Sequence, residues 1–190
     1  MGLQSGRLMR VKLGGRERTS AIVHPGVALR KSAKGRTVYT RTAQRAGQLL
    51  LEHYGERVSF AAAASLAADH IMEVGPDLVF LPSRDIDDYV DHSCEPNCRL
   101  DYRDDGRVFL VALRDVAAGE DLTFDYATTT TRAGVAAFPG WRFACRCGAT
   151  CCRGEVGAAE DLSVDRLRYY ASLGALAPHV LQRVRSLLKD

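Results

Sequence analysis

The apolar positions of this chain fall into short blocks that favour β-strands. Valine, isoleucine, threonine and aromatic residues dominate these blocks, and glycine or proline separates them. We expect strands within 21–27, 37–40, 107–113 and 122–126, and further extended chain over 71–90. The breaks between the blocks indicate turns.

Apolar residues at helical spacing predict four helices in the rest of the chain. We expect two of them at 42–54 and 59–70, and two more, forming a helical hairpin, at 163–173 and 178–188. Ser163 can cap the third helix, and Pro178 suits the first turn of the fourth. Residues 127–140 are rich in threonine, alanine and glycine, so we expect a mobile loop there.

The composition excludes two classes of protein. With 190 residues, 46% of them hydrophobic and 26% charged, the chain can form a real core, which argues against a disordered protein. The longest apolar run, 60–68, stops at Asp69, well short of the ~20 residues that a membrane-spanning helix needs. The N-terminus is basic without an apolar segment, so we expect no secretory signal.

Charge is distributed unevenly along the chain. Residues 1–60 carry 12 basic and 3 acidic side chains, 61–131 carry 5 and 15, and 132–190 carry 9 and 5. The first 20 residues have no stable hydrophobic period, so we expect a loosely packed lead-in. The basic block can contact nucleic acid, but few aromatic residues accompany it, and a solvated arm is the simpler interpretation. The acidic block can attract a lysine-rich protein or can be an ordinary acidic surface.

The cysteines are clustered. They are Cys94, Cys98, Cys145, Cys147, Cys151 and Cys152. In a chain without a secretory signal, this clustering indicates metal ligation before disulfides. The string CRCGATCC that starts at Cys145 brings its thiols within eight residues, and Gly148 permits a tight turn. Structural zinc takes four ligands, so we expect one more from Cys94 or Cys98.

Two common enzyme motifs are missing from the sequence. The pair His92-Ser93 lacks the G-x-S-x-G turn of a serine hydrolase. No G-x-G-x-x-G follows a predicted strand. These absences argue against a serine hydrolase and against a dinucleotide-binding Rossmann fold.

Three strings together resemble the SET domain of protein lysine methyltransferases. Asp91–Asn97 (DHSCEPN) is similar to the family's N-H-S-C-x-P-N, and Gly119–Tyr126 (GEDLTFDY) is similar to G-E-E-L-T-F-D-Y. Cys145–Gly154 resembles the post-SET zinc motif C-x-C-G-x-x-x-C-R-G. The order and spacing of the strings also agree with that family.

The resemblance implies a mainly β fold with short helices, in which short curved sheets surround a knot-like crossing (a β-clip). It divides the chain into a basic lead-in (1–20), the SET domain (21–131), a post-SET loop with its zinc motif (132–157) and a C-terminal helical extension (158–190). The first 93 residues contain no cysteine, so the pre-SET zinc module of some members is missing.

The activity implied by the resemblance is methyl transfer from S-adenosylmethionine to the ε-amine of lysine in a basic protein, such as a histone. Tyr126 matches the family's catalytic tyrosine, and Phe124 matches a position that tunes the number of methyl groups. Phenylalanine there resembles di- or trimethylating members. An apolar channel beside a sulfonium cation lowers the pKa of the substrate lysine, so in-line transfer needs no strong base.

The resemblance also implies ligand contacts. It places contacts with S-adenosylmethionine at Asp91 and His92, at Phe143 beside the adenine, and at Gly26 and Val27 in a first loop. The implied ligands of one structural Zn²⁺ are Cys94, Cys145, Cys147 and Cys152, which leaves Cys98 and Cys151 as spare thiols.

Departures from the family pattern keep an alternative open. Asp91 replaces an asparagine, Asp88 stands where many members carry arginine, and the family's first glycine motif is reduced to His24-Pro25-Gly26. A catalytically weak SET-like module that binds a basic peptide or protein is therefore the second hypothesis. Arginine outnumbers lysine 22 to 4, which hints at a GC-rich, bacterial genome. We expect a cytoplasmic protein if bacterial and a nuclear one if eukaryotic.

Overall fold

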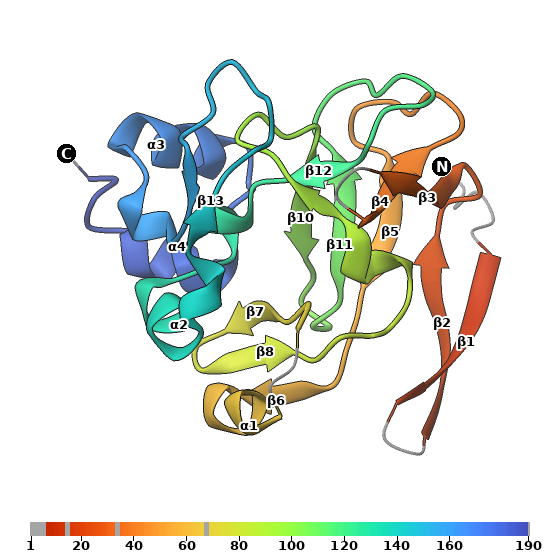
Figure 1. The fold of residues 1–190 in the computed structure, drawn as a ribbon, viewed down its shortest axis with the longest axis horizontal. Helices are drawn as coiled ribbons and strands as arrows, with labels where there is room; N and C mark the ends of the chain where they lie inside the picture. Colours follow the sequence, from red (N-terminus) through yellow and green to blue (C-terminus); the bar gives the residue numbers. More distant parts are fainter. Residues whose placement is uncertain (1–6, 14–15, 33–34, 67–68, 190) are drawn as a thin grey trace. The chain divides into compact units, whose positions relative to one another are not determined.

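The computed structural model describes residues 7–13, 16–32, 35–66 and 69–189, which fold into two compact units (Figure 1). Unit 1 comprises 1–56, 83–91 and 96–124, and unit 2 comprises 57–82, 92–95 and 125–190. The chain passes repeatedly from one unit to the other, so residues distant in sequence meet within each unit.

Unit 1 is built on a five-stranded antiparallel sheet in the order β1-β2-β5-β11-β10. Its strands are β1 (Arg7–Leu13), β2 (Arg16–Val23), β5 (Leu49–His53), β11 (Val108–Ala112) and β10 (Cys98–Tyr102). Every residue of β11 is buried. Leu51 on β5, Leu100 on β10 and Leu110 on β11 are fully buried and form the centre of this core.

Four short elements and a connecting strand complete unit 1. They are β3 (Val27–Ser32), β4 (Gly35–Thr40), η1 (Ile86–Tyr89), β12 (Thr123–Phe124) and β9 (Asp91–His92). β3 and β4 pair as an antiparallel hairpin. β9 lies where the chain passes from unit 1 into unit 2.

Unit 2 combines a small sheet with helices. The sheet has the order β6-β8-β7. In chain order, the strands and helices of unit 2 are β6 (Arg57–Ser59), α1 (Phe60–Ser65), β7 (Met72–Gly75), β8 (Leu78–Phe80), η2 (Tyr126–Thr128), α2 (Arg132–Ala137), η3 (Pro139–Trp141), β13 (Phe143–Ala144), β14 (Glu155–Val156), η4 (Ala159–Asp161), α3 (Val164–Ser172) and α4 (Pro178–Val184). The ring of Phe138 lies 5.5 Å from Phe60 and 4.7 Å from Trp141, which joins α1 to the turn after α2.

Several predicted elements are confirmed, most with shorter bounds. The strand expected at 107–113 is β11, and the strand expected at 122–126 shortens to β12. Ser163 Oγ accepts the Arg166 N–H at 3.3 Å and so caps α3, as expected. Pro178 begins α4, which ends at Val184 rather than near 188.

The helix expected at 42–54 is wrong. Leu49–His53 form β5, which pairs with both β11 and β2. The four residues from Leu50 to His53 are all buried, so the strand has no polar alternation. A short apolar run of this kind occurs both in buried strands and in helices, so the sequence pattern does not distinguish the two.

The mobile loop expected at 127–140 is also wrong. The segment forms η2, α2 and η3, and the four threonines 128–131 are buried. Thr128 and Thr130 donate their hydroxyls to backbone carbonyls at 2.7 and 3.0 Å. Thr131 Oγ1 accepts the Gly134 N–H at 3.1 Å and caps α2. Here the threonines bond locally to the backbone and order it.

The loosely packed lead-in expected at 1–20 is wrong for the part that the structure describes. β1 and β2 pair as an antiparallel hairpin from Arg7 to Val23. Residues 1–6 and 14–15 of that expectation lie outside the described residues.

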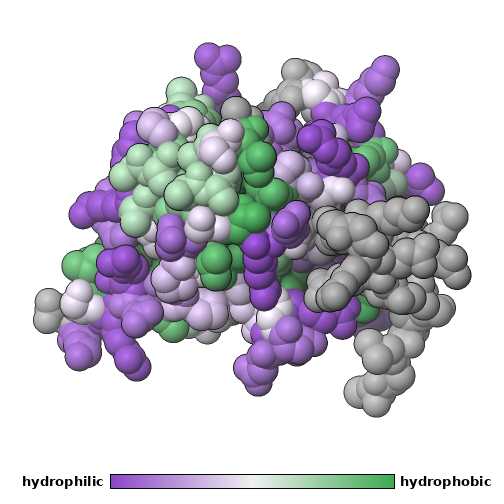
Figure 2. Space-filling view, turned by 90° about the horizontal axis from the view of Figure 1, so that it is seen from below, coloured by the Kyte–Doolittle hydropathy of each residue, from purple (hydrophilic) through white to green (hydrophobic). Residues whose placement is uncertain are grey.

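The surface of unit 2 carries an apolar area around α1. Figure 2 shows apolar side chains gathered on this face, and Leu66 and Leu78 are 59% and 39% exposed. No helix in the described ranges combines the length and the apolar character needed to cross a membrane.

Candidate active site and metal centre

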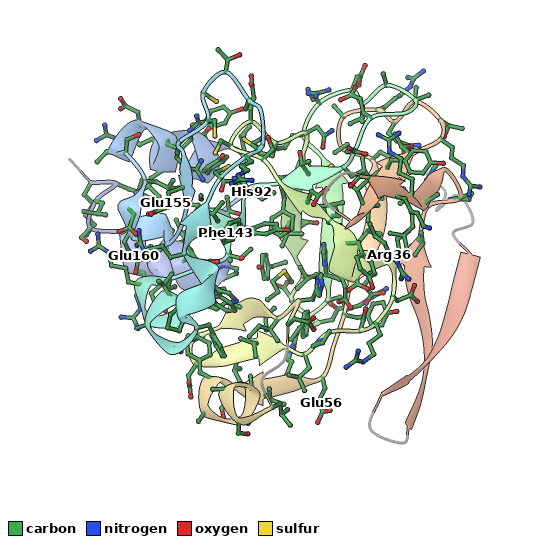
Figure 3. The ribbon with its side chains drawn as sticks, viewed as in Figure 1. Arg36, Glu56, His92, Phe143, Glu155 and Glu160 are labelled. Atoms are coloured by element: carbon green, nitrogen blue, oxygen red, sulfur yellow. The ribbon has the colours of Figure 1, made fainter. Side chains whose placement is uncertain are left out.

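Sulfur atoms converge on one point of unit 2. One ligand atom each from His92, Cys94, Cys145 and Cys147 lies within 4.8 Å of the others, and Figure 3 shows the yellow sulfur atoms gathered near His92. The Cys94 and Cys145 Sγ atoms are 3.8 Å apart. That distance matches the edge of a ZnS₄ tetrahedron with bonds of about 2.3 Å, which is about 3.8 Å. The thiols present therefore fit zinc.

The structure differs from the expected ligand set at one position, because His92 belongs to the group of four and Cys152 does not. Cys152 is nevertheless adjacent, since its Sγ lies 4.0 Å from the Cys145 carbonyl oxygen. Burial raises the pKa of Cys145 to about 12. Burial also opposes ionisation of Cys147, but backbone N–H groups of Cys94 and Ala149 outweigh it and hold the pKa of Cys147 at about 6. Cys147 is thus ready to act as a thiolate.

His92 has hydrogen-bonding contacts at both ring nitrogens. Its Nδ1 accepts the Tyr126 N–H at 3.3 Å, and its Nε2 lies 3.4 Å from Cys94 Sγ. A neutral imidazole that accepts at Nδ1 carries its proton on Nε2. The Nε2–H then points at the Cys94 sulfur, whose pKa is raised by burial.

Asp125 is a buried anion beside this centre, with a fully buried side chain. Arg153 donates Nη1–H and Nη2–H to its two oxygens at 2.6 and 2.8 Å. Tyr170 on α3 donates its hydroxyl to Oδ2 at 2.7 Å, and the Ala127 N–H binds Oδ1 at 3.1 Å. Burial opposes charge on Arg153, yet the bonds to Asp125 raise the pKa of its guanidinium. The guanidinium therefore stays charged beside the Asp125 carboxyl group.

Tyr126 is fixed through its backbone by groups on both sides. Its N–H binds His92, and its carbonyl accepts the Thr129 and Thr130 hydroxyls at 3.1 and 3.0 Å. The Tyr126 and His92 rings lie edge to face with centroids 5.3 Å apart. The expected catalytic tyrosine therefore stands on a rigid segment.

Phe124 lies in the core of unit 1, 5% exposed. Its ring meets that of His53 at 5.9 Å, edge to face. Burial lowers the pKa of His53 to about 3, so this imidazole is neutral. Its Nδ1 lies 3.8 Å from Asp87 Oδ2, and its Nε2 has no hydrogen-bond partner. The His53 side chain, which packs on Phe124, therefore carries a buried nitrogen atom, Nε2, without a hydrogen-bond partner among the described residues.

The residues expected to contact S-adenosylmethionine have other contacts in the structure as well. Asp91 Oδ2 accepts the Thr37 hydroxyl at 2.7 Å. Gly26 has no room for a Cβ, because Thr42 Oγ1 and Gln44 Nε2 occupy that space. Val27 opens β3 and is buried. Phe143 on β13 is 43% exposed (Figure 3), so its ring is available for a ligand.

The two spare cysteines differ from each other. Cys98 is buried in unit 1, where its S–H donates to Asn97 Oδ1 at 3.3 Å, and burial raises its pKa to about 12. Cys151 is exposed in unit 2, with its Sγ 3.7 Å from the Cys94 carbonyl oxygen.

Sequence reasoning assigned no role to Asp125, Arg153, Tyr170 or His53. Asp125 and Arg153 lie inside the strings that carry the family resemblance, so their positions were visible while their pairing was not. Tyr170 and His53 carry no motif, and only their contacts reveal them.

Comparison with known proteins agrees with this geometry. A family model described as SET domain matches residues 27–127. Histone-lysine N-methyltransferase ATX2 of Arabidopsis thaliana is 29% identical over 138 residues, which cover 65% of this chain and 12% of ATX2. A histone-lysine N-methyltransferase of Schizosaccharomyces pombe, H3 lysine-36 specific, is 40% identical over 72 residues, covering 36% of this chain and 8% of that protein. The chain therefore spans a small part of these relatives.

A solved structure has the same fold. KRYPTONITE in complex with mCHH DNA, H3(1–15) peptide and SAH is 25% identical, with a TM-score of 0.57 over 71% of this chain and 30% of that one. The predicted mainly β fold and the predicted family are confirmed by these matches. Because the family match covers more than half of the residues, this chain belongs to the SET domain family.

Proposed function

We propose that this protein transfers methyl groups from S-adenosylmethionine to the ε-amine of lysine in a basic protein. The observation that carries the proposal is the rigid support of Tyr126 in a SET domain: His92 binds its N–H, and Asp125, the preceding residue, is fixed by Arg153. Transfer by in-line displacement demands such precision, because a misplacement of about 1 Å can cost ~10²-fold in rate.

Tyr126 is the catalytic residue of the proposal. Its hydroxyl holds the lysine amine in line with the methyl group, and its backbone contacts fix the ring in place. S-adenosylmethionine, when bound, supplies the electrophilic methyl group next to a sulfonium cation. Like-charge repulsion and desolvation keep the lysine amine neutral, so this chain needs no strong general base.

The residues proposed to hold S-adenosylmethionine are those that the resemblance indicated. Asp91 keeps Oδ1 for the ammonium group, while Oδ2 is bound to Thr37. His92 uses both ring nitrogens elsewhere, so its contribution is through its backbone. Phe143 offers an exposed ring to the adenine, and Gly26 and Val27 contribute the first loop.

One structural zinc ion is proposed at the cysteine cluster. Because His92 Nε2 carries the proton, the fourth ligand beside Cys94, Cys145 and Cys147 is Cys152. A closed four-thiolate site stabilises the fold around Arg153, the residue after Cys152. Metal analysis of freshly purified protein should find one zinc per chain. Well under one zinc per chain would refute the site.

We propose that the product is di- or trimethyl-lysine, because Phe124 brings no hydroxyl to hold a water molecule beside the amine. Phe124→Tyr should shift the product toward monomethyl-lysine in mass spectra. A wild-type enzyme that stops at monomethyl-lysine after long incubation contradicts this assignment.

The proposed substrate is a histone or a histone-like tail. Support comes from the names of the relatives and from the acidic block 61–131, with 15 acidic and 5 basic side chains. The proposed location is accordingly the nucleus, at chromatin, if the protein is eukaryotic, and the cytoplasm if it is bacterial. A nucleic-acid contact of the basic N-terminal block has weaker support, because the DNA belongs to the KRYPTONITE complex.

Labelled S-adenosylmethionine and basic protein substrates test the activity. We expect transfer by the wild type, a loss of about 10²-fold or more in Tyr126→Phe, and no loss in Tyr169→Phe, whose ring is 51% exposed. Binding of S-adenosylmethionine and of peptide without any transfer by the wild type would instead favour the weak, peptide-binding module.

A further inference from the structure

We propose that Tyr170 is a positioning residue for Tyr126, which makes the C-terminal helical extension part of the methyl-transfer machinery. Tyr170 acts through Asp125, to which it donates its hydroxyl at 2.7 Å. The inference deepens the proposed function and rests on it. It assigns a role to α3, an element outside the 27–127 family match.

The contact between Tyr170 and Asp125 depends on the tyrosine hydroxyl. Tyr170 is fully buried, and its O–H donates to the same Oδ2 atom that already accepts from Arg153. Burial and the neighbouring Asp125 raise the pKa of Tyr170, so the hydroxyl keeps its proton and remains a donor. A tyrosine that served only to fill the core would not need its hydroxyl at a buried carboxylate. Phenylalanine would have the same packing surface.

α3 holds Tyr170 firmly. Ser163 caps the helix, Leu167 is fully buried one turn before Tyr170, and the Tyr170 carbonyl accepts the Ala175 N–H at 2.9 Å. The guanidinium of Arg166 lies 5.8 Å from the centre of the Tyr170 ring. The extension therefore presents the hydroxyl from a fixed support.

Asp125 passes this constraint to Tyr126. Its Oδ1 accepts the Ala127 N–H, and its backbone carbonyl accepts the Thr128 N–H at 2.9 Å. These two bonds fix the first turn of η2, which contains Tyr126. Tyr126 follows Asp125 directly and donates its own N–H to His92. Without the Tyr170 hydroxyl, Oδ2 keeps only its bond from Arg153, so Asp125 is held less firmly and the turn that aims the Tyr126 ring loosens.

The test compares Tyr170→Phe with Tyr169→Phe. Each variant removes one hydroxyl from adjacent positions of α3, but Tyr169 is half exposed and Tyr170 is buried. We expect Tyr170→Phe to lower kcat about tenfold. The KM for S-adenosylmethionine and the zinc content should stay at wild-type values, and Tyr169→Phe should match the wild type in all three.

Two results would overturn the inference. One is a kcat of Tyr170→Phe within twofold of the wild type. The other is a loss of activity that matches a loss of zinc or of folded protein, since that outcome shows a merely structural role. NMR of ring-labelled tyrosine adds a readout that does not need turnover. The Tyr126 ring signals should shift in Tyr170→Phe and not in Tyr169→Phe.

The NMR arm separates this inference from the proposed function. If the wild type transfers no methyl group while the Tyr126 signals shift as expected, the proposed activity fails and the positioning contact stands. If the wild type is active and the Tyr126 signals stay unchanged in Tyr170→Phe, the positioning inference fails alone.

Discussion

Two carboxylates of unit 2 are almost equally buried and yet are held in opposite ways. Asp125 is 1% exposed and Glu73 on β7 is 2% exposed. Asp125 faces a guanidinium, that of Arg153, at two oxygens. Glu73 accepts the Thr131 N–H at 2.9 Å and the Thr131 hydroxyl at 2.8 Å, and its nearest basic group, His179 Nε2, lies 3.6 Å away.

The difference lies in the charge that each site keeps. Burial raises the pKa of Glu73 to about 7 against the opposing bonds from Thr131. Burial also lowers the pKa of His179, whose Nε2–H donates to the Thr129 carbonyl at 2.9 Å. The anion beside the proposed catalytic tyrosine is therefore fixed by a cation, whereas the carboxyl between α2 and α4 takes up a proton near neutral pH.

Removing the cation should give the largest effect. Arg153→Ala leaves the Asp125 charge buried without its partner, so we expect a loss of about 3–5 kcal/mol in the free energy of unfolding. Urea denaturation with zinc present measures it. Arg168→Ala, at an exposed ion pair with Asp165, should cost at most ~1 kcal/mol. A similar loss in both variants would contradict the comparison, and adding Asp125→Asn to Arg153→Ala should recover part of the stability.

Crowding the Glu73 carboxylate should give a smaller effect. A Cβ at Gly134 on α2 collides with Glu73 Oε2 and approaches Trp141 to 2.8 Å. We expect Gly134→Ala to destabilise unit 2 by about 1–3 kcal/mol, since neither neighbour can move freely. Gly140→Ala is the matched control, because nothing lies within 4 Å of its Cβ. Equal melting temperatures of the two variants would show that Glu73 and Trp141 can move to make room for the added methyl group.

The same contrast shows what could be predicted from sequence. The cysteine cluster and the string that contains Tyr126 were recognisable, because their spacing is local and chemically specific. The partners of Asp125 were not, because Arg153 and Tyr170 lie 28 and 45 residues further along the chain. Only folding of the extension brings them to one carboxylate.

The errors of the secondary-structure prediction have local causes. Leu49–Leu51 is an apolar run that suits a buried strand and a helix alike, and pairing with β11 decides it. The threonines after Tyr126 suggested a loop, but buried acceptors of the turn and of Glu73 order them. In both segments the tertiary partner overrides the local preference.

The smallest expected effect is a pH dependence that belongs to Glu73. Its folded-state pKa of about 7 lies above the ordinary value of 4.5, so the folded chain binds more protons between these values. The stability linked to Glu73 is fully present below about pH 4.5 and is lost as the pH rises through about 7. A pocket lined by Glu73, His179 and Arg183 brings solvent near the carboxyl, which reduces the change to roughly 1 kcal/mol.

Glu73→Gln isolates this contribution. The amide cannot ionise, and it offers an N–H where Thr131 also donates, so the variant should be less stable at every pH but should lack the decline. Urea denaturation at pH 5, 6.5 and 8 gives the wild-type minus variant difference, which should shrink toward pH 8. Subtraction removes the contributions of other buried groups, such as Asp87, whose pKa burial raises to about 7. The exposed Glu56 (Figure 3) supplies the control Glu56→Gln, whose difference from the wild type should stay constant with pH. A constant difference for Glu73→Gln as well would show that Glu73 takes up no proton over this pH range, and the contrast between the two carboxylates would disappear.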